Sequence, residues 1–156
     1  MPITFSKRLE STLHDIMGGY LTARQGEVCL DKLFLAVLDD RESHGSLIVS
    51  ALLRDWELDR VRSRVENALS CGDGMYYCAD ARALKDYIVS KLAIIYGDDI
   101  PRVINTGHLM FALTGDRRLH SSRIVEKYAV TPLMIFRHLI MLPRTENYLR
   151  RMSRIS

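Results

Sequence analysis

An internal repeat is the feature that most constrains how this chain can fold. Residues 40–49 read DRESHGSLIV and residues 116–125 read DRRLHSSRIV, so Asp, Arg, His, Ser, Ile and Val recur at identical spacing 76 residues apart. The same offset pairs Leu33 with Leu109, whereas Phe5 pairs with Tyr77 at an offset of 72. Two such copies predict two similar units that bury their apolar faces against each other.

The repeat also predicts the domain boundaries. Copy one covers about residues 4–70 and copy two about 76–142, and together they form one domain over residues 1–142. A basic segment, residues 143–156, follows with four arginines and one glutamate, which accounts for the whole net charge of +3. The body is therefore formally neutral, and a neutral body is a poor nucleic-acid binder. The alternative is a helical nucleic-acid-binding protein that uses the arginine-rich segment.

Helical periodicity predicts four helices in each copy and an all-α fold of eight helices. The first helices place apolar residues on one face at Leu9, Leu13, Ile16, Met17 and Tyr20, and at Ala81, Leu84, Ile88, Leu92 and Ile95. The later pairs are expected near 31–38 and 107–114, 45–54 and 121–127, and 59–69 and 132–141.

Three local signals refine these helices. Thr106 is expected to cap the helix over 107–114, because its hydroxyl can accept a free backbone N–H. Thr131-Pro132 reads as an N-cap followed by a proline in the first turn. Gly18-Gly19 falls within the first helix, where it indicates either close packing, an early break or a hinge.

Composition and local sequence indicate the cellular environment of the protein and how its core is stabilised. The start of the chain shows no secretory signal, and no apolar run approaches the roughly 18 residues of a membrane span. Cys29, Cys71 and Cys78 are odd in number and form no Cys-x-x-Cys pair, which favours a reduced, cytoplasmic environment. With 47% hydrophobic residues the chain can bury a core without disulfides or metal.

The sequence contains few candidate catalytic or metal-binding residues. His44 and His120 recur in the repeat, and they are either paired titratable groups or first-turn residues copied with the motif. No His-Glu-x-x-His, Gly-x-Ser-x-Gly or phosphate-binding loop occurs. We therefore expect a protein that is not an enzyme and that binds no ATP, cofactor or metal. A helical enzyme with an unrecognised site is the remaining alternative.

Several motifs together resemble the N-terminal repeat domain of Clp AAA+ unfoldases. Each copy of that domain opens with an aromatic residue, Ser or Thr and a helix, as residues 5–9 do. Its second helix carries a motif of the form Gly-Thr-Glu-His-Ile-Leu-Leu-Gly-Leu, whose counterparts here are residues 29–37 and 105–113. Its Leu-Gly-Val turn corresponds to residues 56–59 and 128–131. The resemblance covers about residues 4–141.

The resemblance implies two four-helix repeats related by a pseudo-two-fold axis. It also implies a non-catalytic role in which protein substrates or adaptors are recruited to a Clp ATPase and its protease. Because the chain lacks the ATPase modules, it would be a free-standing accessory or part of a larger protein. The candidate binding residues lie in the second-helix motifs: Asp31, Lys32, Thr106 and His108.

Some members recognise phosphorylated arginine through an acidic residue of this motif. Asp31 takes that position in copy one, but Gly107 takes it in copy two, so half of such a site is missing.

The basic segment has two interpretations. Tyr148, Leu149, Met152 and Ile155 recur at helical spacing, with arginines on the other faces. One interpretation is an amphipathic segment that docks on a partner, an acidic surface or anionic lipid through Arg150, Arg151 and Arg154. The other is a solvated, frayed end or the start of a linker.

Overall fold

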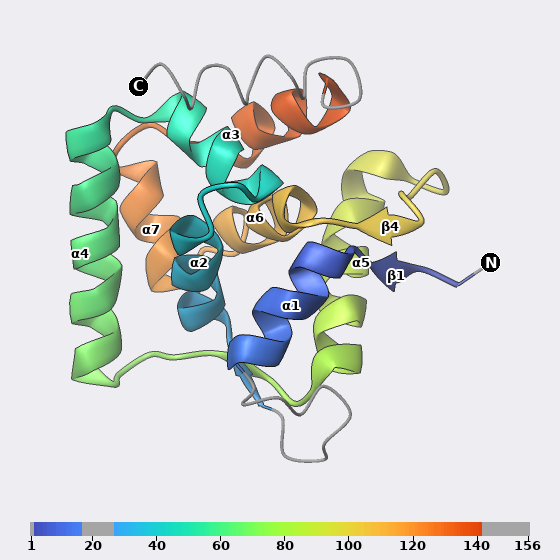
Figure 1. The fold of residues 1–156 in the computed structure, drawn as a ribbon, viewed down its shortest axis with the longest axis horizontal. Coiled ribbons are helices and arrows are strands. Elements are labelled where there is room, and N and C mark those ends of the chain that lie inside the picture. The colour runs from blue at the N-terminus through green and yellow to red at the C-terminus, as the bar shows by residue number, and fades with distance from the viewer. Residues whose placement is uncertain (1, 17–26, 142–156) are drawn as a thin grey trace.

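The structure is a computed structural model that describes residues 2–16 and 27–141, and this part of the chain forms eight helices (Figure 1). Seven are α1 (Lys7–Ile16), α2 (Leu30–Asp39), α3 (His44–Leu52), α4 (Asp55–Cys71), α5 (Ala81–Tyr96), α6 (Thr106–Thr114) and α7 (His120–Glu126). The eighth covers residues 132–141. The prediction of a mostly helical fold with eight helices is confirmed for the described residues.

Two short strand pairs correct the all-α prediction. β1 (Thr4–Phe5) pairs in parallel with β4 (Val103–Ile104), and β2 (Val28–Cys29) pairs antiparallel with β3 (Tyr77–Cys78). Two-residue strands are too short to give an alternating sequence pattern, so periodicity could not have found them. The two pairs differ in direction, and a two-fold relation between the halves stays a prediction.

Helix ends agree with the sequence in some places and not in others. The hydroxyl of Thr131 accepts a hydrogen bond from the N–H of Met134 at 3.3 Å, as predicted for an N-cap. Thr106 is not the cap of α6: the Asn105 side chain accepts from the N–H groups of Gly107 and His108. α4 begins four residues earlier than expected, at Asp55. Gly18-Gly19 lies outside the described residues.

The centre of the molecule is formed by α2 and α6. All nine residues of α6 are buried, and seven of the ten residues of α2 are buried. In Figure 1 these two helices lie in the middle, with α4 and α7 on one side and α1 and α5 on the other. A helix that is buried on every face, as α6 is, is stable only when neighbours cover it all round, which explains its central placement.

The repeated serines of the sequence motif have a structural role. The hydroxyl of Ser46 donates to the carbonyl of Leu38 at 3.0 Å, and that of Ser122 donates to the carbonyl of Thr114 at 2.7 Å. Both donors and both acceptors are 76 residues apart. The hydroxyls thus satisfy carbonyls at the ends of α2 and α6, which the helices themselves leave without partners.

The two sequence copies exchange helix caps. Asp31 on α2 accepts hydrogen bonds from the N–H groups of His120 and Ser121 at the start of α7. In return, the hydroxyl of Thr106 on α6 accepts from the N–H of Gly45 at the start of α3, at 2.8 Å. Each copy therefore supplies hydrogen bonds that the other copy needs, which ties the two halves into one folding unit.

Gly45 is required where α3 crosses α6. A Cβ atom on Gly45 would lie 2.7 Å from Met110 Cγ, from the carbonyl oxygen of Thr106 and from Val37 Cγ1. Such distances are far inside van der Waals contact, so any larger residue would push the helices apart.

None of the helices in the described ranges is long and apolar enough to span a membrane.

Candidate binding groove

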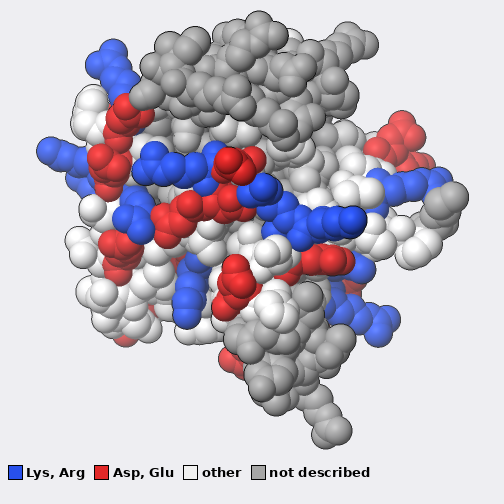
Figure 2. Space-filling model, in the orientation of Figure 1, with Lys and Arg blue, Asp and Glu red and all other residues white. Residues whose placement is uncertain are grey.

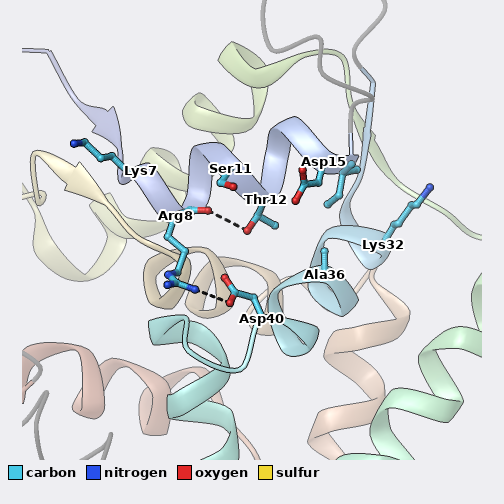
Figure 3. Close-up of a pocket in the computed structure, with 9 residues that line it drawn as sticks. Lys7, Arg8, Ser11, Thr12, Asp15, Lys32, Ala36 and Asp40 are labelled. Atoms are coloured by element: carbon cyan, nitrogen blue, oxygen red, sulfur yellow. Dashed lines mark hydrogen bonds and ion pairs between the residues drawn. The ribbon is translucent and has the colours of Figure 1, made fainter.

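A polar groove lies between α1 and α2 (Figure 3). It has a volume of about 780 Å³. Its wall on α1 is formed by Lys7, Arg8, Ser11, Thr12, Asp15 and Ile16, and its other wall by Lys32, Ala36 and Asp40. The two walls come from residues that are close together in sequence, all within copy one.

The amphipathic character of α1 explains why these side chains face the groove. Leu9 and Leu13 are fully buried and anchor α1 on the core. The hydroxyl of Ser6 accepts a hydrogen bond from the N–H of Leu9 at 3.2 Å and so fixes the start of the helix. With the apolar stripe turned inward, Ser11 and Asp15, four residues apart, lie along the groove (Figure 3).

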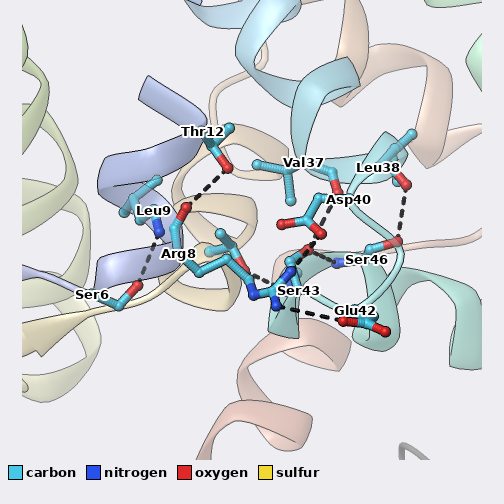
Figure 4. A network of polar contacts seen from close by, with 12 residues as sticks. Ser6, Arg8, Leu9, Thr12, Val37, Leu38, Asp40, Glu42, Ser43 and Ser46 are labelled. Atoms are coloured by element: carbon cyan, nitrogen blue, oxygen red, sulfur yellow. Dashed lines mark hydrogen bonds and ion pairs between the residues drawn. The ribbon is translucent and has the colours of Figure 1, made fainter. Parts of the chain in front are cut away.

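An ion pair crosses one end of the groove. The guanidinium of Arg8 lies 2.6 Å from the carboxylate of Asp40 and 3.6 Å from that of Glu42 (Figure 4). The Arg8 side chain is 47% exposed, so the pair contributes little to the free energy of folding. Its effect is positional, because it links α1 to the residue that follows α2.

The rest of the groove offers polar groups that the described fold does not use. The side chains of Lys7, Ser11, Asp15 and Lys32 make no hydrogen bond or ion pair with any other described residue. Thr12 differs, because its hydroxyl donates to the carbonyl of Arg8 at 3.0 Å. The groove therefore carries donors and acceptors along its sides that the described fold leaves unengaged and that a bound partner could use.

The corresponding position in copy two is closed. Asp116, the counterpart of Asp40, has a side chain that is 3% exposed compared with 28% for Asp40. Its carboxylate accepts hydrogen bonds from Arg118 at 2.9 and 2.8 Å and from the phenol of Tyr87 at 2.8 Å. The Arg118 guanidinium in turn lies 4.6 Å from the ring centre of Tyr76.

Neighbouring side chains shift the pKa values of Asp116 and Tyr87 in this closed cluster. Hydrogen bonds from Arg118 lower the pKa of Asp116 to about 2, although burial opposes the shift. Burial, together with the hydrogen bond to Asp116, raises the pKa of Tyr87. A carboxylate held ionised by a guanidinium and a neutral phenol forms a stable structural unit.

Three of the four candidate residues from the second-helix motifs are buried. Asp31 is 0% exposed and Thr106 is 1% exposed, and each caps a helix of the other copy. His108 is 7% exposed, and its Nδ1 accepts a hydrogen bond from the N–H of Asn105 at 3.0 Å. Lys32 alone is exposed, and it lies in the groove.

The groove residues Arg8, Ser11, Thr12 and Asp40 were not singled out from the sequence. In a single sequence, the polar positions of an amphipathic helix look like an ordinary solvated face. Asp40 did carry a signal, since it begins the repeated motif, but its role depends on Arg8, which is 32 residues away.

The repeated histidines take up structural positions. The Nδ1 atom of His120 accepts from the guanidinium of Arg123 at 3.1 Å, because a guanidinium can only donate. The Nε2 atom must then carry the proton, and it donates to the carbonyl of Asp73 at 2.8 Å. The hydrogen bond to Asp73 connects the segment between α4 and β3 to α7. His44 is the first residue of α3.

Two further histidines have lowered pKa values. Burial, with a smaller contribution from His44, lowers the pKa of His108 to about 4. Burial also lowers the pKa of His138. Both are neutral near pH 7, and His108 must be neutral to accept the hydrogen bond from Asn105.

The described residues form no metal site, and two of the three cysteines are buried. No group of three or more His, Cys, Asp or Glu residues in the described ranges is arranged to hold a metal ion. Cys29 and Cys78 are buried in β2 and β3, Cys71 is exposed, and all three are free thiols. Burial raises the pKa of Cys78 to about 11, so it is a poor nucleophile near pH 7.

Surface charges are intermixed on the face that contains α1 and α4. Figure 2 shows acidic and basic side chains alternating across this face, with no broad area of one sign. Ion pairs among the described residues include Arg62 with Asp39 and Arg117 with Glu126. The other predicted docking residues, Arg150, Arg151 and Arg154, lie outside the described residues.

Similarity to known proteins does not assign this groove. Comparison of the chain with protein-family models, with curated protein sequences and with solved structures finds no match.

Proposed function

We propose that this chain is a non-catalytic protein-interaction module that recruits protein substrates or adaptors to a Clp-type unfoldase and its protease. The binding surface is the groove between α1 and α2. The observation that carries the proposal is the set of unengaged polar side chains, Lys7, Ser11, Asp15 and Lys32, on helices α1 and α2.

The Clp-type assignment rests on the sequence motifs. Of the eight described helices, four lie in about residues 4–70 and four in about residues 76–142, which is compatible with the expected repeats, and α2 and α6 lie in the core. The exchange of caps between α2 and α7 and between α6 and α3 is the kind of packing expected of duplicated units that fold together.

A binding role fits the distribution of perturbed titratable groups. His108, Asp116 and Tyr87 have clearly shifted pKa values, and each of these side chains is engaged in a cap or a buried cluster. A catalytic site usually places its perturbed groups in the cleft that holds the substrate, whereas these three groups hold the fold together, which favours binding over catalysis.

We expect the two copies to bind differently. Copy one presents the open groove beside Asp40, whereas in copy two the phenol of Tyr87 and the guanidinium of Arg118 cover Asp116. A partner would therefore engage one side of the molecule only, with one binding event per chain.

Two matched tryptophan substitutions test the proposal. Ser11→Trp places a bulky side chain in the groove, and Ser63→Trp places the same side chain on the exposed face of α4. Binding to the purified Clp ATPase from the source cells, with and without adaptor, is measured by biolayer interferometry. We expect Ser11→Trp to abolish binding and Ser63→Trp to leave it unchanged, with equal melting temperatures. Equal affinities for both variants, or no binding by the wild type, would refute the proposal.

A further inference from the structure

The last described helix, residues 132–141, has an apolar face turned outward. Leu133 is 53% exposed, Met134 is 37% exposed and Ile140 is 54% exposed. The opposite face packs on the core through Ile135 and Leu139, which are 0% and 5% exposed. The helix is therefore apolar on two faces, but the described residues cover only one of them.

The corresponding helix of copy one shows that the fold does not need this outer face. Val61 and Val65 of α4 are buried in the same way as Ile135 and Leu139, at an offset of 74 residues. At that offset, the counterparts of Leu133, Met134, Arg137 and Ile140 are Asp59, Arg60, Ser63 and Glu66, and all four are exposed. A polar outer face is thus sufficient on α4, and the apolar one on 132–141 indicates a contact.

The sequence that follows this helix has the matching pattern. Tyr148, Leu149, Met152 and Ile155 have the same spacing as Leu133, Met134, Arg137 and Ile140. As a helix, residues 148–155 would span roughly 10 Å, the same length as residues 133–140. Residues 142–146 are enough for the short connection of an antiparallel helix pair.

We propose that residues 148–155 pack as an amphipathic helix, antiparallel to residues 132–141, on the face formed by Leu133, Met134 and Ile140. On such a helix the apolar residues form one stripe, and Arg150, Arg151 and Arg154 fall outside it. Of the occupants that could cover this face, the chain's own segment is favoured because its covalent connection gives it an effective concentration on the order of millimolar.

Hydrogen–deuterium exchange of the full chain tests the proposal. In the wild type we expect amides 148–155 to exchange on the order of tenfold more slowly than an unstructured peptide of the same sequence. Leu149→Asp with Met152→Asp should remove this protection and speed exchange in residues 132–141. Asn147→Asp with Ser153→Asp adds the same two carboxylates off the apolar face and should leave the protection intact.

A variant of the face itself provides the second arm. Leu133→Asp with Ile140→Asp changes two exposed side chains, so the helical circular dichroism should persist while amides 148–155 lose protection. Three results would overturn the proposal. These are wild-type amides that exchange at the free-peptide rate, protection that survives Leu149→Asp with Met152→Asp, and protection that grows with protein concentration alongside a dimer in sedimentation. The last would identify a second copy as the occupant.

Discussion

Asp31 illustrates how one carboxylate can fix the packing of two distant helices. It lies on α2, is fully buried, and accepts from two backbone N–H groups and one hydroxyl at the start of α7. Its chemistry suits an N-cap, because a carboxylate satisfies free N–H groups and complements the positive end of the helix dipole. The acidic position of the second-helix motif therefore has a structural task in this chain.

Asp31→Ala should destabilise the protein by about 2–4 kcal/mol, since it leaves buried donors without an acceptor. Lys32→Ala, at the adjacent exposed position, should change the free energy of unfolding by less than about 0.5 kcal/mol. Urea denaturation followed by circular dichroism measures both values. An Asp31→Ala variant as stable as Lys32→Ala would contradict the capping role.

His108 makes stability depend on pH. Its pKa in the folded protein is about 4, below the value of 6.5 that a histidine has in the unfolded chain. Between these values the unfolded state binds the extra proton, so its stabilising effect is complete above pH 6.5 and is lost as the pH falls toward 4. The shift corresponds to about 3 kcal/mol.

His108→Gln isolates this contribution, because a glutamine can accept the hydrogen bond from Asn105 but does not titrate. His138 shifts in the same direction, so the quantity to compare is the difference between wild type and variant. We expect the difference in unfolding free energy to change between pH 7 and pH 4.5, with the wild type losing more stability. If the unfolding free energies of the two proteins change equally with pH, His108 does not cause the pH dependence.

At the scale of elements, helices were predictable and strands were not. Apolar spacing and the Thr131-Pro132 signal placed the helix over 132–141, and the repeat placed its counterparts. The strands have only two residues each and depend on backbone pairing between segments about 50 to 100 residues apart. Thr106 was assigned to the wrong helix, because local sequence could not show that its hydroxyl accepts from Gly45 of α3.

The turn between α7 and the helix over 132–141 contains a strained residue. Ala129 has a φ of 63°, and it is exposed. A left-handed backbone costs an alanine roughly 1 kcal/mol relative to glycine, because its Cβ crowds the following carbonyl. The turn itself is held by the N–H of Val130, which donates to the carbonyl of Val125 at 3.1 Å.

Ala129→Gly should therefore raise the free energy of unfolding by up to about 1 kcal/mol. Ala93→Gly, at an exposed position inside α5, should lower it by about 1 kcal/mol, because glycine is a poor helix former. Thermal denaturation of both variants gives the comparison. A decrease in stability at both positions would show that the left-handed turn carries no strain.

At the scale of the whole molecule, the two sequence copies share some internal contacts and differ in how exposed their equivalent positions are. The serine contacts at the ends of α2 and α6 are preserved in both copies. The aspartates that begin the repeated motif differ, because Asp40 borders an open groove and Asp116 is enclosed by Tyr87 and Arg118. A repeat shows that two positions are related, but only the three-dimensional surroundings show that one of them is open.

The central claim is that copy one binds a protein partner through the groove between α1 and α2. A photo-crosslinking residue at Ser11 reports directly on the groove. Asp86 on α5 is its counterpart in copy two, because the buried pairs Leu9 with Leu84 and Leu13 with Ile88 share an offset of 75 residues. Both positions are exposed, so the same photoreactive side chain can be placed at each without disturbing the core.

The measurement that tests this claim most directly is the yield and identity of crosslinked adducts in lysate from the source cells, with mass spectrometry of each adduct. We predict a strong adduct at position 11 that contains a Clp ATPase, an adaptor or a client protein, and a weak one at position 86. No adduct at position 11, or equal yields of the same proteins at both positions, would contradict the assignment of the groove.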